Sequence, residues 1–266
     1  MTGGIAGAGW LRIIGLGPGA AAQRTPEAEA ALAEATDIVG YGPYVARVPA
    51  RPDQRRHSTD NRVELERARH ALSMAEAGAR VAVVSSGDAG VFAMAGAVFE
   101  ALEGGPEGWR ALDIQVLPGI SAMFAAAARL GAPLGHDFCA ISLSDNLKPW
   151  PLVERRLRAA AEAGFVMALY NPISKARPWQ LGRAFALLAE VLPPETPVAF
   201  ATAVSRPEER IEIRPLREAD PSLADMRTLV LVGSASTRAV PRKGGPDAGE
   251  RPWLYTPRSA PGGSRA

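Results

Sequence analysis

Short apolar runs alternate with helix-like stripes along the first half of this chain, and this alternation restricts its fold more than any other feature. Each run is too short for a helix and is followed directly by Gly or Pro, which is typical of a buried strand. Between the runs, apolar residues recur at spacings of three and four, as in Leu65, Ala68, Leu72 and Ala75. The predicted strands are 10–16, 37–41, 80–86 and 113–117. Strands that alternate with helices of this length predict parallel βαβ units.

The second half has a different rhythm. Strand-like runs at 198–204, 211–215 and 228–232 follow one another with little helix between them. Residues 211–214 alternate apolar and charged side chains, which is typical of a half-exposed antiparallel strand. We therefore predict a mixed sheet here and a boundary near residues 118–119. The expected fold class is α/β, with an N-terminal parallel-sheet domain, a C-terminal mixed-sheet domain and the active-site cleft between them.

Both ends of the chain differ in composition from the segments between them. Residues 1–9 are rich in Gly and Ala, and residues 241–266 hold five Pro and five Gly among 26. Such segments bury too little apolar surface to become ordered. We expect a flexible N-terminus over 1–9, domains over 10–118 and 119–240, and a mostly disordered tail over 241–266. Within that tail, only the large side chains of 253–255 could pack on the body.

Composition excludes several kinds of site. Cys139 is the only cysteine, so disulfide scaffolds, CxxC redox sites and cysteine-held metal clusters are excluded within one chain. His57, His70 and His136 show no HxH or HExxH spacing, and we predict no metal site. The net charge of +2 does not indicate a nucleic-acid partner. No apolar run reaches the ~18 residues of a membrane span, and no basic signal segment opens the chain, so we expect a cytoplasmic protein without a membrane partner.

The loop after the first predicted strand matches GxGxxA over Gly15–Ala20. A dinucleotide fold would need the next helix to open directly on this loop, but the N-cap signal at Thr25 comes six residues after Gly19. Pro18 removes a backbone amide, and Asp37 stands at the start of its strand rather than the end. A nucleotide-dependent oxidoreductase remains an alternative, as does a tight turn without a ligand. The third interpretation is a glycine floor that a ligand approaches closely.

Three further loops of small or polar residues follow predicted strands, at 85–90, 118–122 and 170–172. In open α/β sheets, ligands bind outside the carboxyl ends of the strands. Any one of these loops could be a plain turn. Together they predict a site built from backbone and short side chains.

These loops resemble the motifs of the tetrapyrrole (corrin/porphyrin) methylase family. The matching segments are GLGPG after the first strand, SSGDAGV after the third, PGISA after the fourth and ALYNP in the second half. They stand in the family's order, and the resemblance covers roughly residues 10–240. It implies S-adenosylmethionine as cofactor, S-adenosylhomocysteine as its product, and a homodimer.

Three longer segments are similar to the ring-contraction branch of this family: 85–96, 141–150 and 168–175. In that branch, as at Ala89 here, alanine follows the aspartate of the GD pair. The resemblance implies methylation of precorrin-3B at C(17) with ring contraction to precorrin-4, in aerobic cobalamin synthesis. The alternatives are another precorrin or cobalt-precorrin methyltransferase of the family and a non-catalytic carrier of a corrin intermediate.

The resemblance also implies site residues. Methyl transfer from a sulfonium rests on placing the donor and the nucleophile in line, which suits a site without a nucleophilic triad. Asp88 is the best-placed carboxylate for acid–base work, its alternative role being an N-cap, and His57 is the second candidate. The implied cofactor contacts are Pro18, Ser86, Gly87, Asp88, Val91, Ser121, Ala122, Asn171 and Ala201.

An anionic tetrapyrrole such as precorrin-3B requires cations in its site. Arginines are concentrated around His57, and the planar guanidinium binds carboxylates bidentately. The alternative interpretation of this segment is a solvated basic loop. The arginines of the segment are Arg47, Arg51, Arg55, Arg56 and Arg62. The predicted substrate contacts are Arg47, Arg51, Arg55, Arg56, Ser142, Ser144 and Lys148.

Overall fold

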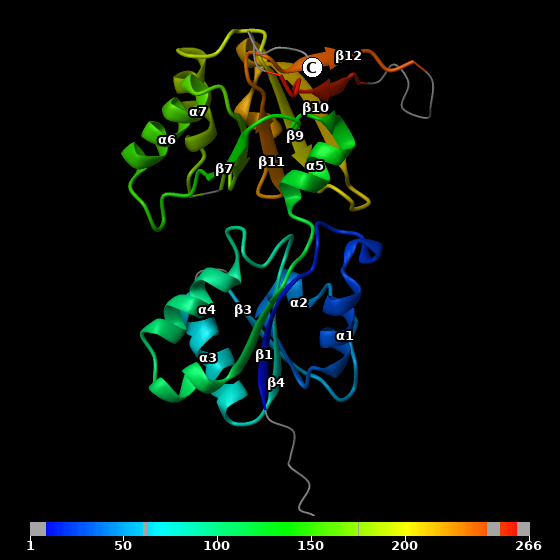
Figure 1. The fold of residues 1–266 in the computed structure, drawn as a ribbon, viewed down its shortest axis with the longest axis vertical. Helices are drawn as coiled ribbons and strands as arrows, with labels where there is room; N and C mark the ends of the chain where they lie inside the picture. The colour runs from blue at the N-terminus through cyan, green and yellow to red at the C-terminus, as the bar shows by residue number, and fades with distance from the viewer. Residues whose placement is uncertain (1–8, 61–62, 175, 244–250, 260–266) are drawn as a thin grey trace, which may run out of the picture. The chain divides into compact units, whose positions relative to one another are not determined.

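The computed structural model describes residues 9–60, 63–174, 176–243 and 251–259. The chain forms two compact units, Met1–Ala122 and Met123–Ala266, each with its own sheet and core (Figure 1). The division falls at the start of a helix, a few residues beyond the predicted turn at Pro118–Gly119. The expected two-domain α/β fold is confirmed.

The sheet of the first unit has five parallel strands in the order β3-β2-β4-β1-β5. Because all strands run the same way, the loops that follow them lie at one edge, the carboxyl edge of unit 1. The register places Gly15 of β1 beside Ser85 of β4, so the loops after these two strands start side by side. The strands are β1 (Trp10–Gly15), β2 (Asp37–Tyr41), β3 (Arg55–Thr59), β4 (Arg80–Ser85) and β5 (Asp113–Leu117).

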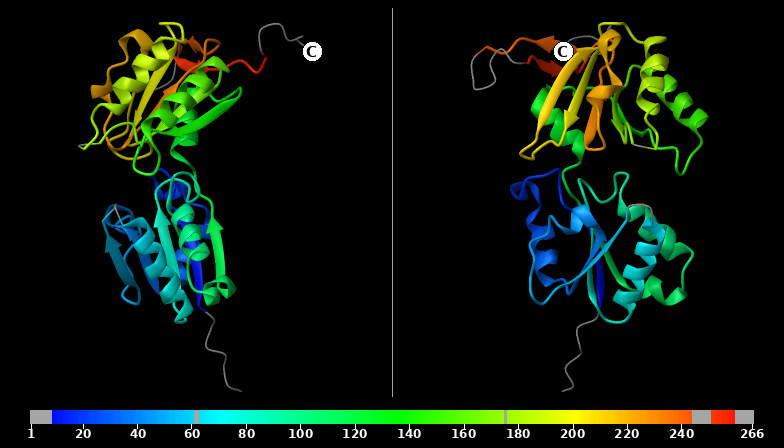
Figure 2. Two further views of the ribbon diagram at one scale, coloured as in Figure 1. Left: turned by 90° about the vertical axis from the view of Figure 1, so that its left-hand side faces the viewer. Right: turned by 180° about the vertical axis from the view of Figure 1, so that it is seen from behind.

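Helices cover both faces of this sheet (Figure 2). Because successive side chains of a strand point to opposite faces, Leu11 and Ile13 pack with α3 and α4, whereas Ile14 packs with α1. A strand buried on both faces is apolar at nearly every position, which explains the continuous apolar runs of the sequence. The helices are α1 (Pro26–Glu34), α2 (Gly42–Val45), α3 (Glu64–Glu76) and α4 (Met94–Glu103).

The edge strand β3 and the short helix α2 are not among the predicted elements. Residues 55–59 carry no apolar side chain, so neither a continuous apolar run nor alternation marks them as a strand. Their strand conformation depends on backbone pairing with β2, in which Arg55 lies beside Asp37 and Thr59 beside Tyr41. Part of the predicted basic loop is therefore a strand.

The sheet of the second unit is mixed, as predicted, with the order β10-β9-β11-β8-β7. β7 and β8 are parallel, and β11 is antiparallel to both β8 and β9. The strands β7, β8 and β9 therefore end at the same edge, the carboxyl edge of unit 2. The strands are β7 (Phe138–Ser142), β8 (Val166–Tyr170), β9 (Pro197–Thr202), β10 (Arg210–Pro215) and β11 (Thr228–Val232).

One face of this second sheet packs on two helices, α6 (Trp150–Glu162) and α7 (Gln180–Ala189). Phe200 is the largest fully buried side chain of this core and stacks edge-on against Phe185 of α7. A third helix, α5 (Ala122–Leu130), lies on the other side of the sheet (Figure 1). Among the helices of the described ranges, none has the length and apolar character to span a membrane.

The C-terminal segment contains a strand, which differs from the expected disordered tail. β13 (Trp253–Tyr255) pairs with β12 (Arg238–Val240) and, in parallel, with β6 (Gly131–Ala132). Leu254 is only 2% exposed, and the hydroxyl of Thr256 donates to the carbonyl of Pro133 at 2.6 Å. The apolar 253–255 segment thus supplies buried surface that the Pro and Gly content of residues 241–266 does not predict. The predicted flexible residues 1–8 and the tail residues 244–250 and 260–266 lie outside the described part.

Candidate functional site

A reciprocal pair of backbone hydrogen bonds joins the loops that follow β1 and β4. The amide of Gly17 donates to the carbonyl of Gly87 at 3.0 Å, and the amide of Gly87 donates to the carbonyl of Gly17 at 2.9 Å. Their φ angles are 66° and 68°, in the left-handed region that favours glycine. The two loops are thus fixed against each other without any side chain.

Glycines also let three loops of this edge approach closely. A Cβ on Gly15 would lie 2.7 Å from the amide nitrogen of Gly119, and a Cβ on Gly119 would lie 2.3 Å from the carbonyl oxygen of Gly87. Side chains at positions 15 and 119 would therefore displace backbone. A Cβ on Gly87, in contrast, would meet nothing nearer than the amide of Ala122 at 3.6 Å. The space at Gly87, bordered by residues 120–122 of the loop after β5, is a cradle that a side chain would fill.

Helix α1 does not open on this glycine loop. It begins at Pro26, where the hydroxyl of Thr25 accepts a hydrogen bond from the amide of Ala28 at 3.1 Å. A 3-10 turn over Ala21–Gln23 separates the glycine loop from the helix. The predicted late start of the helix is confirmed, and it leaves no helix N-terminus at the loop for a dinucleotide pyrophosphate.

Asp88 ties the loop after β4 to the loop after β5. Its Oδ1 accepts from the amide of Gly90 at 2.8 Å, and its Oδ2 accepts from the amide of Gly119 at 3.0 Å. Helix α4 begins at Met94, so Asp88 is not its N-cap. Both carboxylate oxygens hold backbone amides, which favours a positioning role over proton transfer. Other predicted cofactor residues of these loops are Pro18, Ser86, Val91, Ser121 and Ala122, all buried or half-buried.

Arg47, two residues after the end of α2, braces the loops that follow β1 and β4. Its Nη1 donates to the hydroxyl of Ser86 at 2.9 Å, and its Nη2 donates to the carbonyls of Leu16 and Gly17 at 3.0 and 2.8 Å. A guanidinium presents donors in a rigid fork, so it can hold several acceptors in one geometry. These contacts are made within the protein and favour a positioning role for Arg47 over the predicted contact with substrate.

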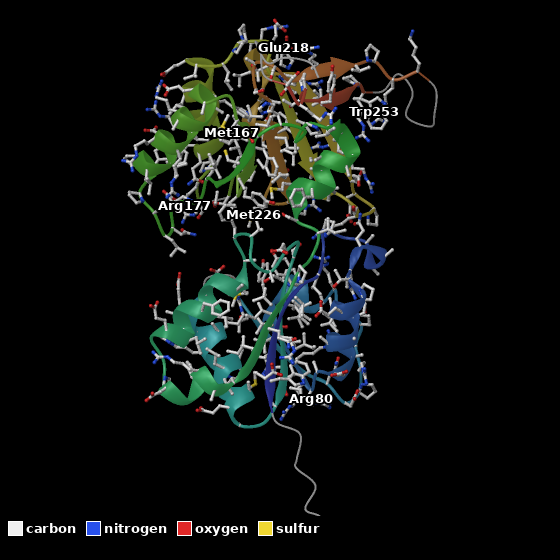
Figure 3. The ribbon with its side chains drawn as sticks, viewed as in Figure 1. Arg80, Met167, Arg177, Glu218, Met226 and Trp253 are labelled. Carbon is white, nitrogen blue, oxygen red and sulfur yellow. The ribbon has the colours of Figure 1, made fainter. Side chains whose placement is uncertain are left out.

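Asp37 organises the opposite, amino edge of unit 1, where Arg80 is labelled in Figure 3. Its side chain is fully buried and accepts hydrogen bonds from Arg55 at 2.9 Å, His57 at 2.8 Å and Thr36 at 2.7 Å. Burial raises the pKa of Asp37, but the hydrogen bonds from Arg55, Thr36 and His57 outweigh it and hold the pKa below 3.8. Since Asp37 pairs with the second residue of β4, it lies about 13 Å along the strand from the glycine loops.

The structure therefore divides the predicted arginine cluster. Arg55 and His57 belong to the Asp37 cluster, with His57 Nδ1 3.4 Å from His70 Nε2. Arg51 donates to the carbonyl of Ala33 at 2.6 Å. Only Arg47 of the described members touches the glycine loops, and Arg62 lies outside the described residues. The acid–base role predicted for His57 is not supported by its place in the fold.

Arg56 supports the segment that carries Arg47. Its guanidinium donates to the carbonyls of Val45, Val48 and Pro49 at 2.8–2.9 Å. Backbone carbonyls that are withdrawn from water need such partners. Arg56 thus stabilises the fold of residues 45–49, and a predicted contact with substrate would compete with these bonds.

The carboxyl edge of unit 2 brings together three of the predicted site residues. The side-chain amide of Asn171 donates to the hydroxyl of Ser142 at 2.9 Å, and that hydroxyl also accepts from the amide of Ser144 at 3.3 Å. The preceding residue, Tyr170, accepts a hydrogen bond from the amide of Met123, in the first turn of α5, at 3.2 Å. The ends of β7, β8 and α5 are thereby linked.

Residues with left-handed backbone also lie in loops that follow strands of both sheets. Among the described residues, four non-glycine residues have positive φ: Phe92 at 51°, Asn171 at 52°, Ala203 at 50° and Ser205 at 64°. They follow β4, β8 and β9, all at carboxyl edges. Such strained residues cluster at functional sites, where the surrounding structure maintains them. Ala201, a predicted cofactor contact, is buried in β9 two residues before Ala203.

A polar network that was not predicted joins the loops after β7 and β8. Oδ1 of Asp145 accepts from Arg177 Nε at 2.8 Å and from Nε2 of the buried Gln180 at 3.1 Å; Arg177 is labelled in Figure 3. Lys148 is half-buried in the same loop, and burial together with nearby Arg156 holds its pKa below the usual value. No local pattern reveals the pairing, because the partners are more than thirty residues apart.

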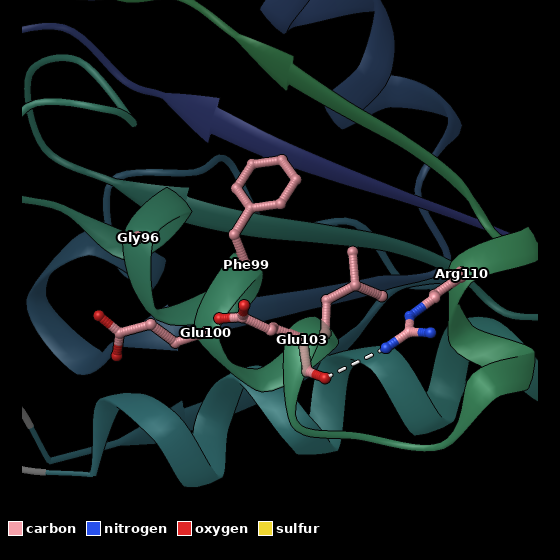
Figure 4. A pocket seen from close by; sticks show the side chains of 6 residues that line it. Gly96, Phe99, Glu100, Glu103 and Arg110 are labelled. Carbon is pink, nitrogen blue, oxygen red and sulfur yellow. Dashed lines mark hydrogen bonds between the residues drawn. The ribbon is translucent and has the colours of Figure 1, made fainter.

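A surface hollow on unit 1 lies away from the glycine loops, between α4 and the 3-10 helix Glu107–Ala111 (Figure 4). At one end of the hollow, Arg110 donates a hydrogen bond to the carbonyl of Glu103 at 3.4 Å. No predicted site residue lines it, so it does not belong to the candidate site. The lining residues are Gly96, Phe99, Glu100, Leu102, Glu103 and Arg110.

The carboxyl edge of unit 1 thus offers backbone amides and carbonyls, small side chains and one carboxylate held by amides. Within the described ranges, no group of three His, Cys, Asp or Glu side chains could hold a metal ion. An edge of this kind suits a ligand bound by shape and main-chain contacts. It can orient a reactive group without itself supplying a nucleophile.

Comparison with known proteins assigns the family. The family model for Tetrapyrrole (Corrin/Porphyrin) Methylases matches residues 11–220. A precorrin-3B C(17)-methyltransferase from Sinorhizobium sp. is 58% identical over 257 residues, which span 97% of this chain and 99% of that protein. The crystal structure of the methyltransferase CobJ superposes with a TM-score of 0.87 at 58% identity, over 94% of this chain and 100% of that one. A uroporphyrin-III C-methyl transferase from Thermus thermophilus, solved with S-adenosylhomocysteine, shares the fold at a TM-score of 0.64 and 23% identity, over 85% and 92% of the two chains. The chain belongs to the tetrapyrrole (corrin/porphyrin) methylase family.

Proposed function

We propose that this chain methylates precorrin-3B at C(17), with S-adenosylmethionine as methyl donor and ring contraction to precorrin-4, in aerobic cobalamin (vitamin B12) biosynthesis. The observation that carries the proposal is the 58% identity, over nearly the full length of both chains, to the Sinorhizobium precorrin-3B C(17)-methyltransferase. The glycine cradle and the three branch-specific segments agree with it.

The residues of unit 1 fit a sulfonium cofactor of this kind. The cradle at Gly87 has room where a Cβ would stand, and the surrounding groups are backbone and the small side chains of Ser86, Ser121 and Ala122. When bound, S-adenosylmethionine would supply an electrophilic methyl group on positively charged sulfur. The electron pair of the sulfur–methyl bond would leave with the sulfur. The contacts of Asn171 and Ala201 with the cofactor remain predictions from the family resemblance.

The chain's own contribution is positioning. The Gly17–Gly87 bridge, the Asp88 carboxylate and the Arg47 guanidinium hold the loops after β1, β4 and β5 in one arrangement. A preset arrangement lowers the entropic cost of bringing the donor methyl group to the attacking carbon. For the anionic macrocycle, Lys148 is the cation we propose beside the Ser142–Asn171 pair, in the segment shared with the ring-contraction branch.

Incubation with precorrin-3B and S-adenosylmethionine labelled in its methyl group tests this function. We expect one labelled methyl group at C(17) of a ring-contracted product, located by NMR. Label at another carbon would assign another methyltransferase of the family, and turnover only of a cobalt-containing substrate would assign a cobalt-precorrin enzyme. Substrate binding without transfer would indicate a carrier, and hydride transfer with a nicotinamide cofactor an oxidoreductase.

A homodimer and a cytoplasmic location are part of the same proposal. Both rest on the resemblance to the family and on the expected biosynthetic role. Sedimentation equilibrium of the full chain tests the dimer, and fractionation of cells that express it tests the location. A monomer at micromolar concentration, or recovery with membranes, would contradict the respective part.

A further inference from the structure

The turn after β9 contains two non-glycine residues with left-handed backbone. Ala203 and Ser205 both have left-handed backbone, with φ angles of 50° and 64°. Neither is glycine, so both conformations have a steric cost that the surrounding structure must offset. The turn is fixed at its start, where the amide of Ala203 donates to the carbonyl of Arg227 at 3.1 Å.

The Glu209 carboxylate holds the other end of this turn. Its Oε2 accepts a hydrogen bond from the amide of Ser205 at 2.6 Å, a short bond of the kind made by ionised acceptors. The carboxylate side chain is mostly buried, with 24% exposure. Glu209 therefore provides the hydrogen-bond acceptor for the amide of Ser205, which lies four residues before it in the chain.

Arg129, in the last turn of α5, holds Glu209 in place. Its Nε lies 3.0 and 3.2 Å from the two oxygens of Glu209, and its Nη2 lies 3.5 Å from the hydroxyl of Ser205. The carbonyl of Arg129 accepts from Arg242 at 3.1 Å, and the Arg242 guanidinium stacks on the ring of Trp253, 3.5 Å from its centroid. A continuous series of contacts thus runs from the turn through α5 to β13, where Trp253 is labelled in Figure 3.

We propose that Glu209 and Arg129 are positioning residues for the cofactor: they hold the Ala203–Ser205 turn in the shape that receives it beside Ala201. The inference rests on the proposed function for the identity of the ligand. A turn with two left-handed residues relaxes when its anchoring amide loses its acceptor, and the binding geometry is lost with it. Ala201 lies two residues before the turn, so the change reaches a predicted contact directly.

Isothermal titration of the full chain with S-adenosylhomocysteine tests the proposal, together with hydrogen exchange of the amides of residues 203–206. We expect Glu209→Ala and Arg129→Ala each to raise the Kd about tenfold and to speed this exchange, while the double variant adds little because the pair acts as one unit. Glu209→Gln keeps an acceptor oxygen and is expected to recover part of the affinity. Glu190→Ala, which removes the exposed Arg158–Glu190 pair, is the matched control and should bind as the wild type does.

Kinetics separate positioning from general destabilisation. We expect the KM for S-adenosylmethionine to rise in Glu209→Ala with kcat nearly unchanged at saturation, and partial rescue in Glu209→Gln. Should Glu209→Ala fail to fold, Glu209→Gln and Arg129→Lys carry the same test. Variants that fold and bind like the wild type would overturn this proposal alone, whereas a wild type that does not bind S-adenosylhomocysteine would overturn the proposed function.

Discussion

The carboxylate of Asp88 accepts a hydrogen bond from the amide of Gly119 at 3.0 Å, thirty-one residues further along the chain. Its other oxygen accepts from Gly90, so one side chain closes its own loop and joins it to the next. The sequence motif suggests that Asp88 is an acid–base residue, but in the structure its carboxylate holds backbone amides. Mutation can distinguish the positioning role from proton transfer.

Replacement of Asp88 by Ala removes both of these acceptors. We expect the free energy of unfolding to fall by about 1.5–3 kcal/mol, the range for hydrogen bonds to a charged group, and the Kd for S-adenosylhomocysteine to rise. Asp113→Ala, which removes an exposed ion pair with Arg12 at the amino edge, is the control and should leave the Kd unchanged. A proton-transfer role would instead lower kcat with the Kd intact.

Gly87 combines backbone conformation with space for a ligand. Gly87→Ala should cost about 1–2 kcal/mol because of its positive φ, and Gly87→Leu should in addition abolish binding of S-adenosylhomocysteine by filling the cradle. Gly78 is the matched control: its φ is 91°, and a Cβ at this position would meet nothing within 4 Å, so Gly78→Leu carries strain without obstruction. Titration calorimetry compares the two. Wild-type affinity in folded Gly87→Leu would remove this loop from the site.

Arg55 and Arg47 test the division of the arginine cluster. Arg55→Ala should leave the KM for the macrocycle unchanged at low salt, because Arg55 bonds to Asp37 at the amino edge. Arg47→Ala should raise the Kd for S-adenosylhomocysteine, because Ser86 and Gly17 lose their common donor. Steady-state kinetics at two salt concentrations and calorimetry measure these effects. A salt-dependent rise of KM in Arg55→Ala would restore the predicted role in substrate binding.

Asp37 makes stability depend on pH in a defined direction. Because its pKa is lowered in the folded chain, its ionised form stabilises the fold above about pH 4, the usual carboxyl pKa, and this contribution is lost as the pH falls through the lowered pKa. The difference in unfolding free energy between wild type and Asp37→Asn should shrink as the pH falls below about pH 4. Urea denaturation at several pH values below about pH 5 measures it. A difference that grows as the pH falls below about pH 4 would contradict the assignment.

The C-terminal strand should contribute to stability. Leu254→Ala empties a fully enclosed position and should cost about 2–5 kcal/mol, as large-to-small changes in cores do. Val240→Ala, in the neighbouring strand but 43% exposed, is the control and should cost much less. A chain that ends at Arg242 should lose melting temperature for the same reason. Equal melting temperatures for the full and shortened chains would show that β13 adds nothing.

The sequence predicts those elements whose signal is local. The predicted strands at 10–16, 37–41 and 80–86 become β1, β2 and β4, which are buried on both faces, so their apolar runs identify them. The start of α1 could be predicted because Thr25 is a favourable N-cap and Pro26 a favourable first helical residue. The glycine loops could be placed at one edge because parallel strands share their direction.

The elements that were missed depend on partners distant in sequence. Strand β3 has no apolar residue and exists through its pairing with β2, and β13 is ordered by a parallel partner more than a hundred residues away. The arginines show the same limit. The sequence shows that Arg55 and Arg56 are cationic. Only the fold shows that Arg55 already pairs with a carboxylate of the protein and that Arg56 already donates to backbone carbonyls.

The parallel pairing of β13 with β6 also sets an order of assembly during synthesis. All five strands of the first unit have emerged once Leu117 leaves the ribosome, so that sheet can close while translation continues. The small sheet of the second unit pairs Leu254 with Gly131 and must wait until the chain between them has been made. Until then the face that Leu254 covers stays open, and a stalled or truncated nascent chain would expose it to chaperones and proteases.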